Sequence, residues 1–299
     1  MCTQAAPLLK AMVLVAAISV IAGGAAPAAA QISVTHEFLP AQNLADPAAG
    51  QNNAKIESKA FSVNVAFPVA LKNGRTVLIN ELFYQRRDFS YKGFAGGNPV
   101  IGNIHDLNYT LSIQHGFSEK WALLASVTPG LASDFNASLS GGDFNFQAVT
   151  AFIRTKSPRF SYGFGAVYST QFGQPIPLPV IALNWNNGGK LRWDTILPVS
   201  SEFWYTASQK LNLGLLFGLN GNTYNTDSRL FAVPDPQLRY FTLTLGPSIG
   251  YRLSSILRVK VEGGLVGVQQ YQLYSGNTKQ SSLNLKPSSF VRIGLSLGG

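Results

Sequence analysis

Residues 106–114 read Asp-Leu-Asn-Tyr-Thr-Leu-Ser-Ile-Gln, so polar and apolar side chains alternate without a break. Successive side chains of a β-strand point to opposite faces of its sheet, so this segment predicts a strand with one polar and one apolar face. The same alternation recurs at residues 160–169 and 241–246. Repeated segments of this kind predict a β-barrel that spans a membrane, with lipid outside and a polar interior.

The first thirty residues have the composition of a secretory signal peptide. Lys10 is their only charge, residues 11–22 are mostly apolar, and small side chains at residues 28–30 suit a cleavage site. The apolar run is too short to cross a bilayer as a helix, and no later segment is apolar enough. The only cysteine, Cys2, would be removed, so the mature chain would form no disulfide. We expect a signal peptide at residues 1–30 and one barrel domain at residues 31–299.

The charge content also favours a protein in contact with lipid. Charged residues make up 12% of the chain and hydrophobic residues 46%, whereas soluble domains carry about 25% charged residues. The net charge is +9, but the basic residues are scattered and no basic run is longer than Arg86 and Arg87. We therefore expect no nucleic-acid partner.

Turn signals divide the chain into antiparallel strands. Tight turns fall at residues 72–75, 118–120, 156–159, 186–189, 208–210 and 254–256, and long polar connections at residues 41–57, 87–102, 133–142, 220–237 and 275–282. Three turns repeat a serine, namely Ser118, Ser208 and Ser254, and we expect them at one membrane face. The fold class is therefore all-β, a transmembrane antiparallel up-and-down barrel of fourteen strands. Twelve is the alternative, because residues 32–39 and 191–205 give weaker signals.

Aromatic residues close to the tight turns predict a belt at the membrane interface, where amphipathic rings are favoured. The predicted belt consists of Trp121, Phe160, Trp185, Trp193, Tyr205 and Tyr251.

Residues 173–224 contain PLPVI at 177–181, WNN at 185–187 and LP at 197–198. With these motifs the chain resembles a family of bacterial outer-membrane β-barrels that is known only as a domain of unknown function. The resemblance implies the fold and an outer-membrane location, with outer-membrane lipid and the barrel-assembly machinery as partners. It brings no catalytic or binding residues. Barrels of this membrane commonly end in an aromatic residue, whereas this chain ends at Gly299.

Three histidines limit acid-base and metal chemistry. By alternation His36, His105 and His115 lie on the apolar face, and none has a serine two positions away on the same face. A barrel-embedded lipid-modifying enzyme would need a hydroxyl within hydrogen-bond reach of a histidine. We therefore expect no enzyme, and assign no catalytic, cofactor-binding or metal-binding residues.

Seven charged residues occupy strand positions whose side chains the alternation directs into the barrel, and they are the candidate lumen charges. The four basic ones would give the lumen a positive field that favours anions, unless salt bridges neutralise them. They are Asp106, Arg192, Asp194, Arg258, Lys260, Glu262 and Arg292.

We predict a small passive pore for small polar or anionic solutes, with residues 87–102 or 220–237 as the constriction. Two alternatives stay open beside the enzyme. One is a closed structural or surface-interaction barrel, and the other is a soluble secreted β-sandwich. The sequence does not indicate an oligomeric state.

Overall fold

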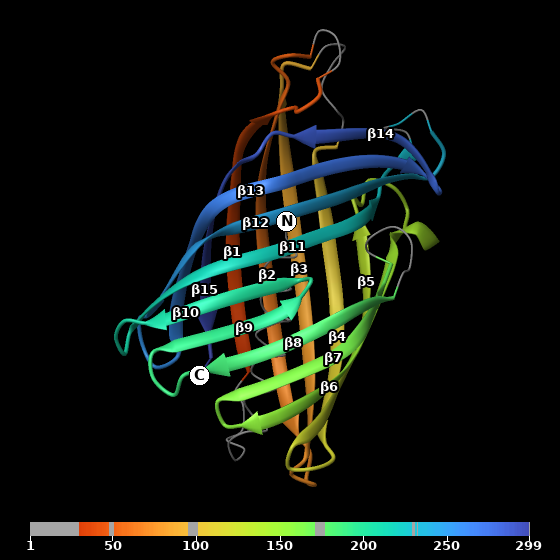
Figure 1. Cartoon of the computed structure of the whole chain (residues 1–299). Coiled ribbons are helices and arrows are strands. Elements are labelled where there is room, and N and C mark those ends of the chain that lie inside the picture. Colours follow the sequence, from red (N-terminus) through yellow and green to blue (C-terminus); the bar gives the residue numbers. More distant parts are fainter. Residues whose placement is uncertain are drawn as a thin grey trace.

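The computed structural model describes residues 30–47, 51–94, 101–170, 177–228, 231 and 233–298. Within them it forms strands and one short 3-10 helix, η1 (Gly141–Asp143) (Figure 1). The strands are β1 (Gln31–Asn43), β2 (Lys55–Ala70), β3 (Thr76–Lys92), β4 (Asn103–Gly116), β5 (Trp121–Ser133), β6 (Phe144–Ser157), β7 (Phe160–Ser169), β8 (Leu178–Asn186), β9 (Leu191–Leu197), β10 (Ser200–Thr206), β11 (Leu211–Asn225), β12 (Pro236–Arg252), β13 (Leu257–Ser275), β14 (Thr278–Leu285) and β15 (Ser288–Leu297).

The strands form one closed antiparallel sheet. Each strand from β1 to β13 pairs with its neighbours along the chain, and β15 pairs with both β13 and β1. The first half of β13 pairs with β15 and its second half with β14. Since β14 and β15 together fill one position in the wall, the barrel has fourteen wall positions. The predicted fold class is confirmed with fourteen strands, and neither twelve strands nor a sandwich of two sheets describes it.

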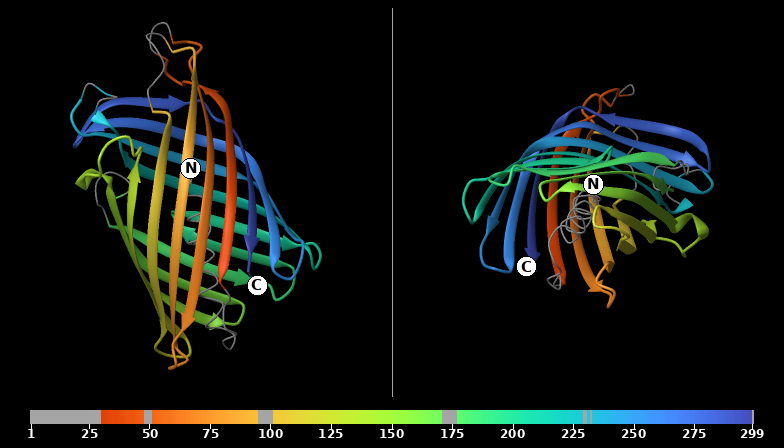
Figure 2. Two further views of the ribbon diagram at one scale, coloured as in Figure 1. Left: turned by 180° about the vertical axis from the view of Figure 1, so that it is seen from behind. Right: turned by 60° about the horizontal axis from the view of Figure 1, so that its bottom comes forward.

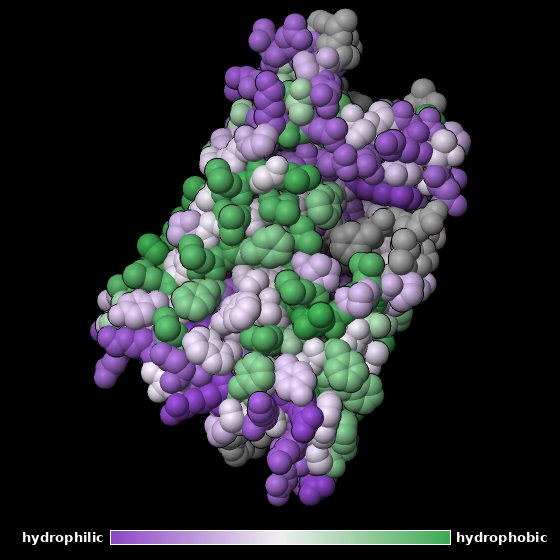
Figure 3. Space-filling view, in the orientation of Figure 1, coloured by the Kyte–Doolittle hydropathy of each residue, from purple (hydrophilic) through white to green (hydrophobic). Residues whose placement is uncertain are grey.

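Lipid-facing and inward-facing side chains alternate as the sequence predicts. In β4, Asp106 and Asn108 are 0% and 1% exposed, whereas Leu107 and Tyr109 are 36% and 43% exposed. The outward side chains of many strands form an apolar band with polar residues on both sides of it (Figure 3). This band is the surface that would face hydrocarbon. Among the described residues, no helix has the length and hydropathy to cross a bilayer.

The two ends of the barrel differ, and we call them the turn end and the loop end. The turn end holds the three repeated turns, which have the same hydrogen bonds. In each, the serine hydroxyl accepts the backbone N–H groups two and three residues later, as Ser118 does from Lys120 and Trp121. The predicted placement of these turns at one face is therefore confirmed. The longer connections gather at the loop end.

The strands β7 to β10 are short, with seven to ten residues each, so this part of the barrel wall extends less far toward the loop end. The segment that gave an ambiguous strand signal thus forms two strands, β9 and β10. Beyond the β9–β10 turn, the taller β11 leans over to β5, where Asn225 pairs with Ser133 and accepts the N–H of Asp134. The Asn225 amide also donates to Ser140, which precedes η1. This contact narrows the loop end of the barrel.

The strands β1 to β4 form one wall, and β8 to β13 cross behind them at a steep angle as the opposite wall (Figure 2). Side chains that project inward from these two walls therefore face one another across the lumen. Inward side chains of β5 to β7, such as Asn145, line the lumen between these two walls.

Engineered cysteines test the closure of the sheet. Val34 of β1 is the register partner of Leu295 of β15, and facing residues of antiparallel strands lie about 4.5–5.5 Å apart at Cα, within disulfide range. In a Cys2→Ser background, we expect Val34→Cys with Leu295→Cys to form an intramolecular disulfide on mild oxidation, detected by mass spectrometry.

Val34→Cys with Val291→Cys is the control, because Val291 lies opposite Phe38, four residues away along the same strand. Equal cross-linking of the two pairs would contradict the described register.

Candidate functional site

A network of buried ion pairs lies inside the barrel. Arg87 of β3 lies 3.0 Å from one carboxylate oxygen of Glu37 on β1, and Arg292 of β15 lies 2.7 Å from the other. Arg292 also pairs with Glu262 of β13. The side chain of Arg87 is fully buried and those of Glu37, Glu262 and Arg292 nearly so. Buried charges are tolerated only when paired, and here each one has a partner of opposite sign.

Lys260 extends the network to the opposite side of the barrel. Its Nζ lies 2.6 Å from Glu262 and 3.4 Å from Glu202 of β10, and it also lies over the ring of Trp204. The complete network holds three basic and three acidic groups, so its formal charge is zero. The positive lumen field predicted from the sequence is therefore absent at this level, because salt bridges neutralise the basic groups.

The predicted lumen charges divide into two groups. Two of them lie exposed at the turn end, namely Arg192 and Arg258. The other five lie inside the barrel: Asp106, Asp194, Lys260, Glu262 and Arg292. Sequence reasoning missed Glu37, Arg87 and Glu202. The alternation that places His36 outward would have placed Glu37 inward, but the other two lie where we expected a loop or a weak strand.

Direct contacts bridge the lumen between strands that are not neighbours. The Asn222 amide of β11 donates to Asp106 Oδ2 of β4 at 2.9 Å, and Asn108 donates to the other oxygen of Asp106 at 2.7 Å. The Arg87 guanidinium of β3 lies 5.4 Å from the ring centre of Tyr240 on β12. These contacts connect the two walls across the lumen.

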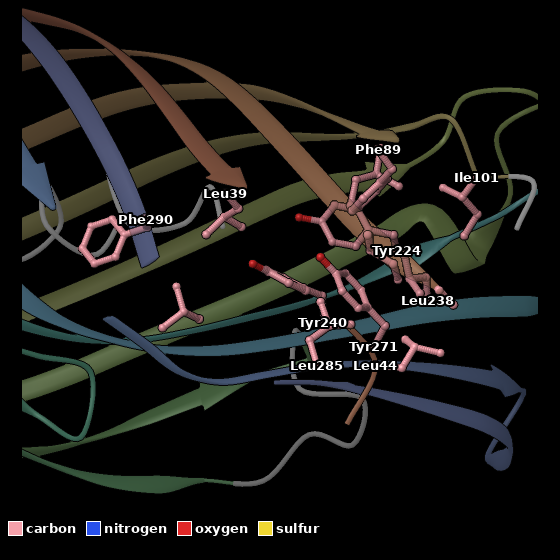
Figure 4. Close-up of a cluster of buried hydrophobic side chains, with 14 of the residues drawn as sticks. Leu39, Leu44, Phe89, Ile101, Tyr224, Leu238, Tyr240, Tyr271, Leu285 and Phe290 are labelled. Carbon is pink, nitrogen blue, oxygen red and sulfur yellow. The ribbon is translucent and has the colours of Figure 1, made fainter. Parts of the chain in front are cut away.

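An apolar cluster fills the loop-end part of the lumen. The rings of Tyr240 and Tyr271 lie 5.0 Å apart, and Phe89 meets Tyr271 edge-on at 5.7 Å. Figure 4 shows these rings, with Tyr224 and Leu238, projecting toward one another from β3, β11, β12 and β13. The prediction of a polar interior is therefore wrong for this part of the barrel.

The apolar interior arises because the polarity of the alternation reverses at the loop end. In β3, Phe89 is buried and Tyr91 half-buried, while Ser90 and Lys92 are exposed outside. The outer face here lies beyond the apolar band, so it is polar, and the inner face can be apolar. This reversal made residues 87–92 look like a loop, although β3 continues to Lys92. The residues of the two predicted constrictions that lie in the lumen, such as Arg87, Phe89 and Asn222, belong to strands. Residues 95–100, 229, 230 and 232 of these ranges lie outside the described residues, so a constriction by the loops themselves stays a prediction.

The predicted aromatic belt lies on the outer wall near the turn end. Trp193, Tyr205 and Tyr251 are exposed there. The guanidinium of Arg154 covers Trp121 at 5.4 Å, and Trp185 faces both Phe160 and Trp193 in the register of adjacent strands. The role of this aromatic belt at a membrane interface stays a prediction.

The histidines lie on the outer wall, as expected. His105 binds the Tyr84 hydroxyl at 2.8 Å and Asn103 at 2.9 Å. His115 Nδ1 lies 2.8 Å from the Thr76 hydroxyl, a cross-strand partner that sequence spacing did not reveal. Thr76 is 4% exposed and takes part in a turn with Asn73. A hydroxyl that is buried in a turn is poorly placed to attack a lipid.

Comparison with solved structures finds an outer-membrane channel of similar fold. The COG4313 outer membrane channel from Pseudomonas putida F1 has 12% sequence identity and a TM-score of 0.50, and the match covers 92% of this chain and 97% of the channel's chain. The P. putida toluene transporter TodX has 9% identity and a TM-score of 0.43, covering 92% and 91%. LpxR from Salmonella typhimurium has 8% identity and a TM-score of 0.35, covering 89% and 99%. At 12% identity, the likeness to the COG4313 channel shows the fold alone. No curated protein sequence matches this chain.

A family model matches almost the complete barrel. It is described as a domain of unknown function, DUF6268, and it covers residues 26–298. This match confirms the resemblance inferred from residues 173–224. The chain belongs to the DUF6268 family.

Proposed function

We propose that this protein is a passive channel of the bacterial outer membrane for small polar solutes, and that the structure described above is its closed form. The turn end faces the periplasm and the loop end the exterior. Outer-membrane lipid surrounds the apolar band, and the barrel-assembly machinery inserts the chain after export by the predicted signal peptide.

Unpaired polar groups inside the barrel carry this proposal. Gln42, Asn64, Asn145 and Asn220 are buried, and their side-chain amides have no hydrogen-bond partner among the described residues. An unpaired buried polar group costs about 1–3 kcal/mol, so a permanent structural filling would be expected to pair such groups. A lumen that fills with water when it opens gives each amide a partner.

A closed structural or surface-interaction barrel is the second candidate. The contacts of Asp106 with Asn222 and of Arg87 with Tyr240 favour it, because they fill the lumen from opposite walls. The two proposals differ in one measurable property, which is ion conductance.

The charge distribution supports polar solutes, and basic residues at one mouth support a preference for anions there. The buried network is neutral, whereas Arg192, Arg252 and Arg258 interact electrostatically at the turn end. Basic groups at a pore mouth raise the local concentration of anions.

Weakening the contact between Asp106 and Asn222 tests the channel. We expect Asp106→Ala with Asn222→Ala to raise the open probability in planar bilayers several-fold, because one of the cross-lumen bridges is lost. Asp88→Ala is the control, since Asp88 pairs with Arg86 on the outer wall. If folded wild-type protein and the double variant both fail to conduct, the structural barrel is correct.

Reversal potentials in a salt gradient test the basic mouth. Replacing Arg192, Arg252 and Arg258 together by serine is expected to lower the permeability ratio of chloride to potassium. The matched control is Arg154→Ser, which removes an arginine from the outer wall beside Trp121. An unchanged ratio in the triple variant would refute a role for these arginines in selectivity.

A further inference from the structure

Resting on the proposed channel, we infer that its lumen contains a binding site for a neutral sugar. Asparagine amides would hydrogen-bond the hydroxyl groups, and the aromatic rings beside them would pack against the apolar face of the sugar ring.

Three asparagines lie in one row of register partners that runs from β2 to β6. Asn64 of β2 faces Phe83 of β3, which faces Asn108 of β4. The row continues through Gly130 of β5 to Asn145 of β6. All three asparagines point inward and are at least nine-tenths buried. The row thus presents amide groups side by side on the inner face of adjacent strands.

These amides have hydrogen-bonding capacity to spare. Both polar atoms of Asn64 and of Asn145 lack a partner within the part of the chain that the structure describes, and so does Asn108 Oδ1. Asn108 Nδ2 is occupied by Asp106. The row therefore offers both donors and acceptors, which is what hydroxyl groups require, since each hydroxyl donates and accepts.

Gly130 allows two of the amide oxygens to converge. A Cβ at this position would lie 2.0 Å from Asn108 Oδ1 and 2.5 Å from Asn145 Oδ1. Any larger residue would displace both amides. The glycine thus keeps two unpaired acceptor oxygens together over the middle of the row.

The opposite wall completes the site. Asn220 of β11 is 2% exposed, and neither of its amide atoms has a partner among the described residues. Asn222 on the same face of β11 reaches across to Asp106. Polar groups therefore approach a solute from both walls when the lumen opens.

Aromatic rings lie beside Asn222 on the opposite wall, whereas on β3 Arg87 of the ion-pair network lies between Phe83 of the row and the ring of Phe89. Tyr240 is the register partner of Asn222, and Tyr224 is the next inward residue of β11. Tyr271 packs against Tyr240. A sugar ring has a face of C–H groups and a rim of hydroxyls, so it matches an aromatic surface that adjoins an amide row.

Other solute classes fit less well. An apolar solute would leave the buried amides unpaired, which sites of this kind reject strongly. An anion would meet a network in which Arg87, Lys260 and Arg292 already have carboxylate partners. A neutral solute with many hydroxyls satisfies the amides and leaves the ion pairs intact.

Maltose is the probe. We expect it to block ion current through the channel in planar bilayers and to release or absorb heat on titration into the folded detergent-solubilised protein. Asn145→Leu and Asn220→Leu should each weaken binding about three- to tenfold, since each removes hydrogen bonds worth roughly 0.5–1.5 kcal/mol. Gly130→Ala should weaken it similarly while retaining every amide.

Asn212→Leu is the control, because Asn212 lies near the turn end and bonds Thr206. Heat-dependent gel mobility verifies that each variant is folded. A conducting channel without maltose block or heat overturns the sugar site and leaves the channel intact. Maltose binding without conductance supports the site and overturns the channel. Equal maltose affinity in wild type, Asn145→Leu, Asn220→Leu and Gly130→Ala assigns any binding to another place and overturns the asparagine row.

Discussion

Hydrocarbon offers no hydrogen bonds to a polypeptide backbone, so a sheet in a bilayer must pair every strand edge. The pairing of β15 with β1 closes the sheet and fixes the rest of the molecule. Once the sheet is closed, each strand separates two environments, and alternation becomes obligatory along the apolar band. The side chains of Asp106 and Leu107 differ in exposure for this reason, although they are neighbours in sequence.

The contents of the interior follow from the cost of burying polar groups. Buried charges such as Arg292 are paired, amides such as Asn145 are unpaired, and the aromatic rings near the loop end pack together and meet the ion-pair network where Arg87 contacts Tyr240. The ion pairs balance in charge, which lowers the cost of desolvation. The amides lack hydrogen-bond partners among the described residues, so nothing offsets the cost of their desolvation. This contrast places the least satisfied part of the interior next to contacts that join the two walls.

The local sequence pattern predicted the structural features that depend on a single strand or turn. The parity of residues 106–114, the repeated serine turns and the inward position of Arg292 all follow from side-chain alternation. It did not predict contacts between strands far apart in the chain, such as Arg87 with Tyr240, because no local rule specifies which inward residues meet across a lumen. It also failed where polarity reverses, as at Phe89, since the alternation was interpreted with lipid always outside.

The division of one wall position between β14 and β15 has a consequence for how the barrel is completed. β15 alone forms the regular ladder with β1, over seven residue pairs, while β14 reaches the first strand only through the bridge between Leu44 and Leu285. The seam is therefore continuous on one half of the barrel and thin on the other. The junction beside β14 holds fewer backbone hydrogen bonds than the ladder of β15 with β1, so it is the part of this seam that separates most readily.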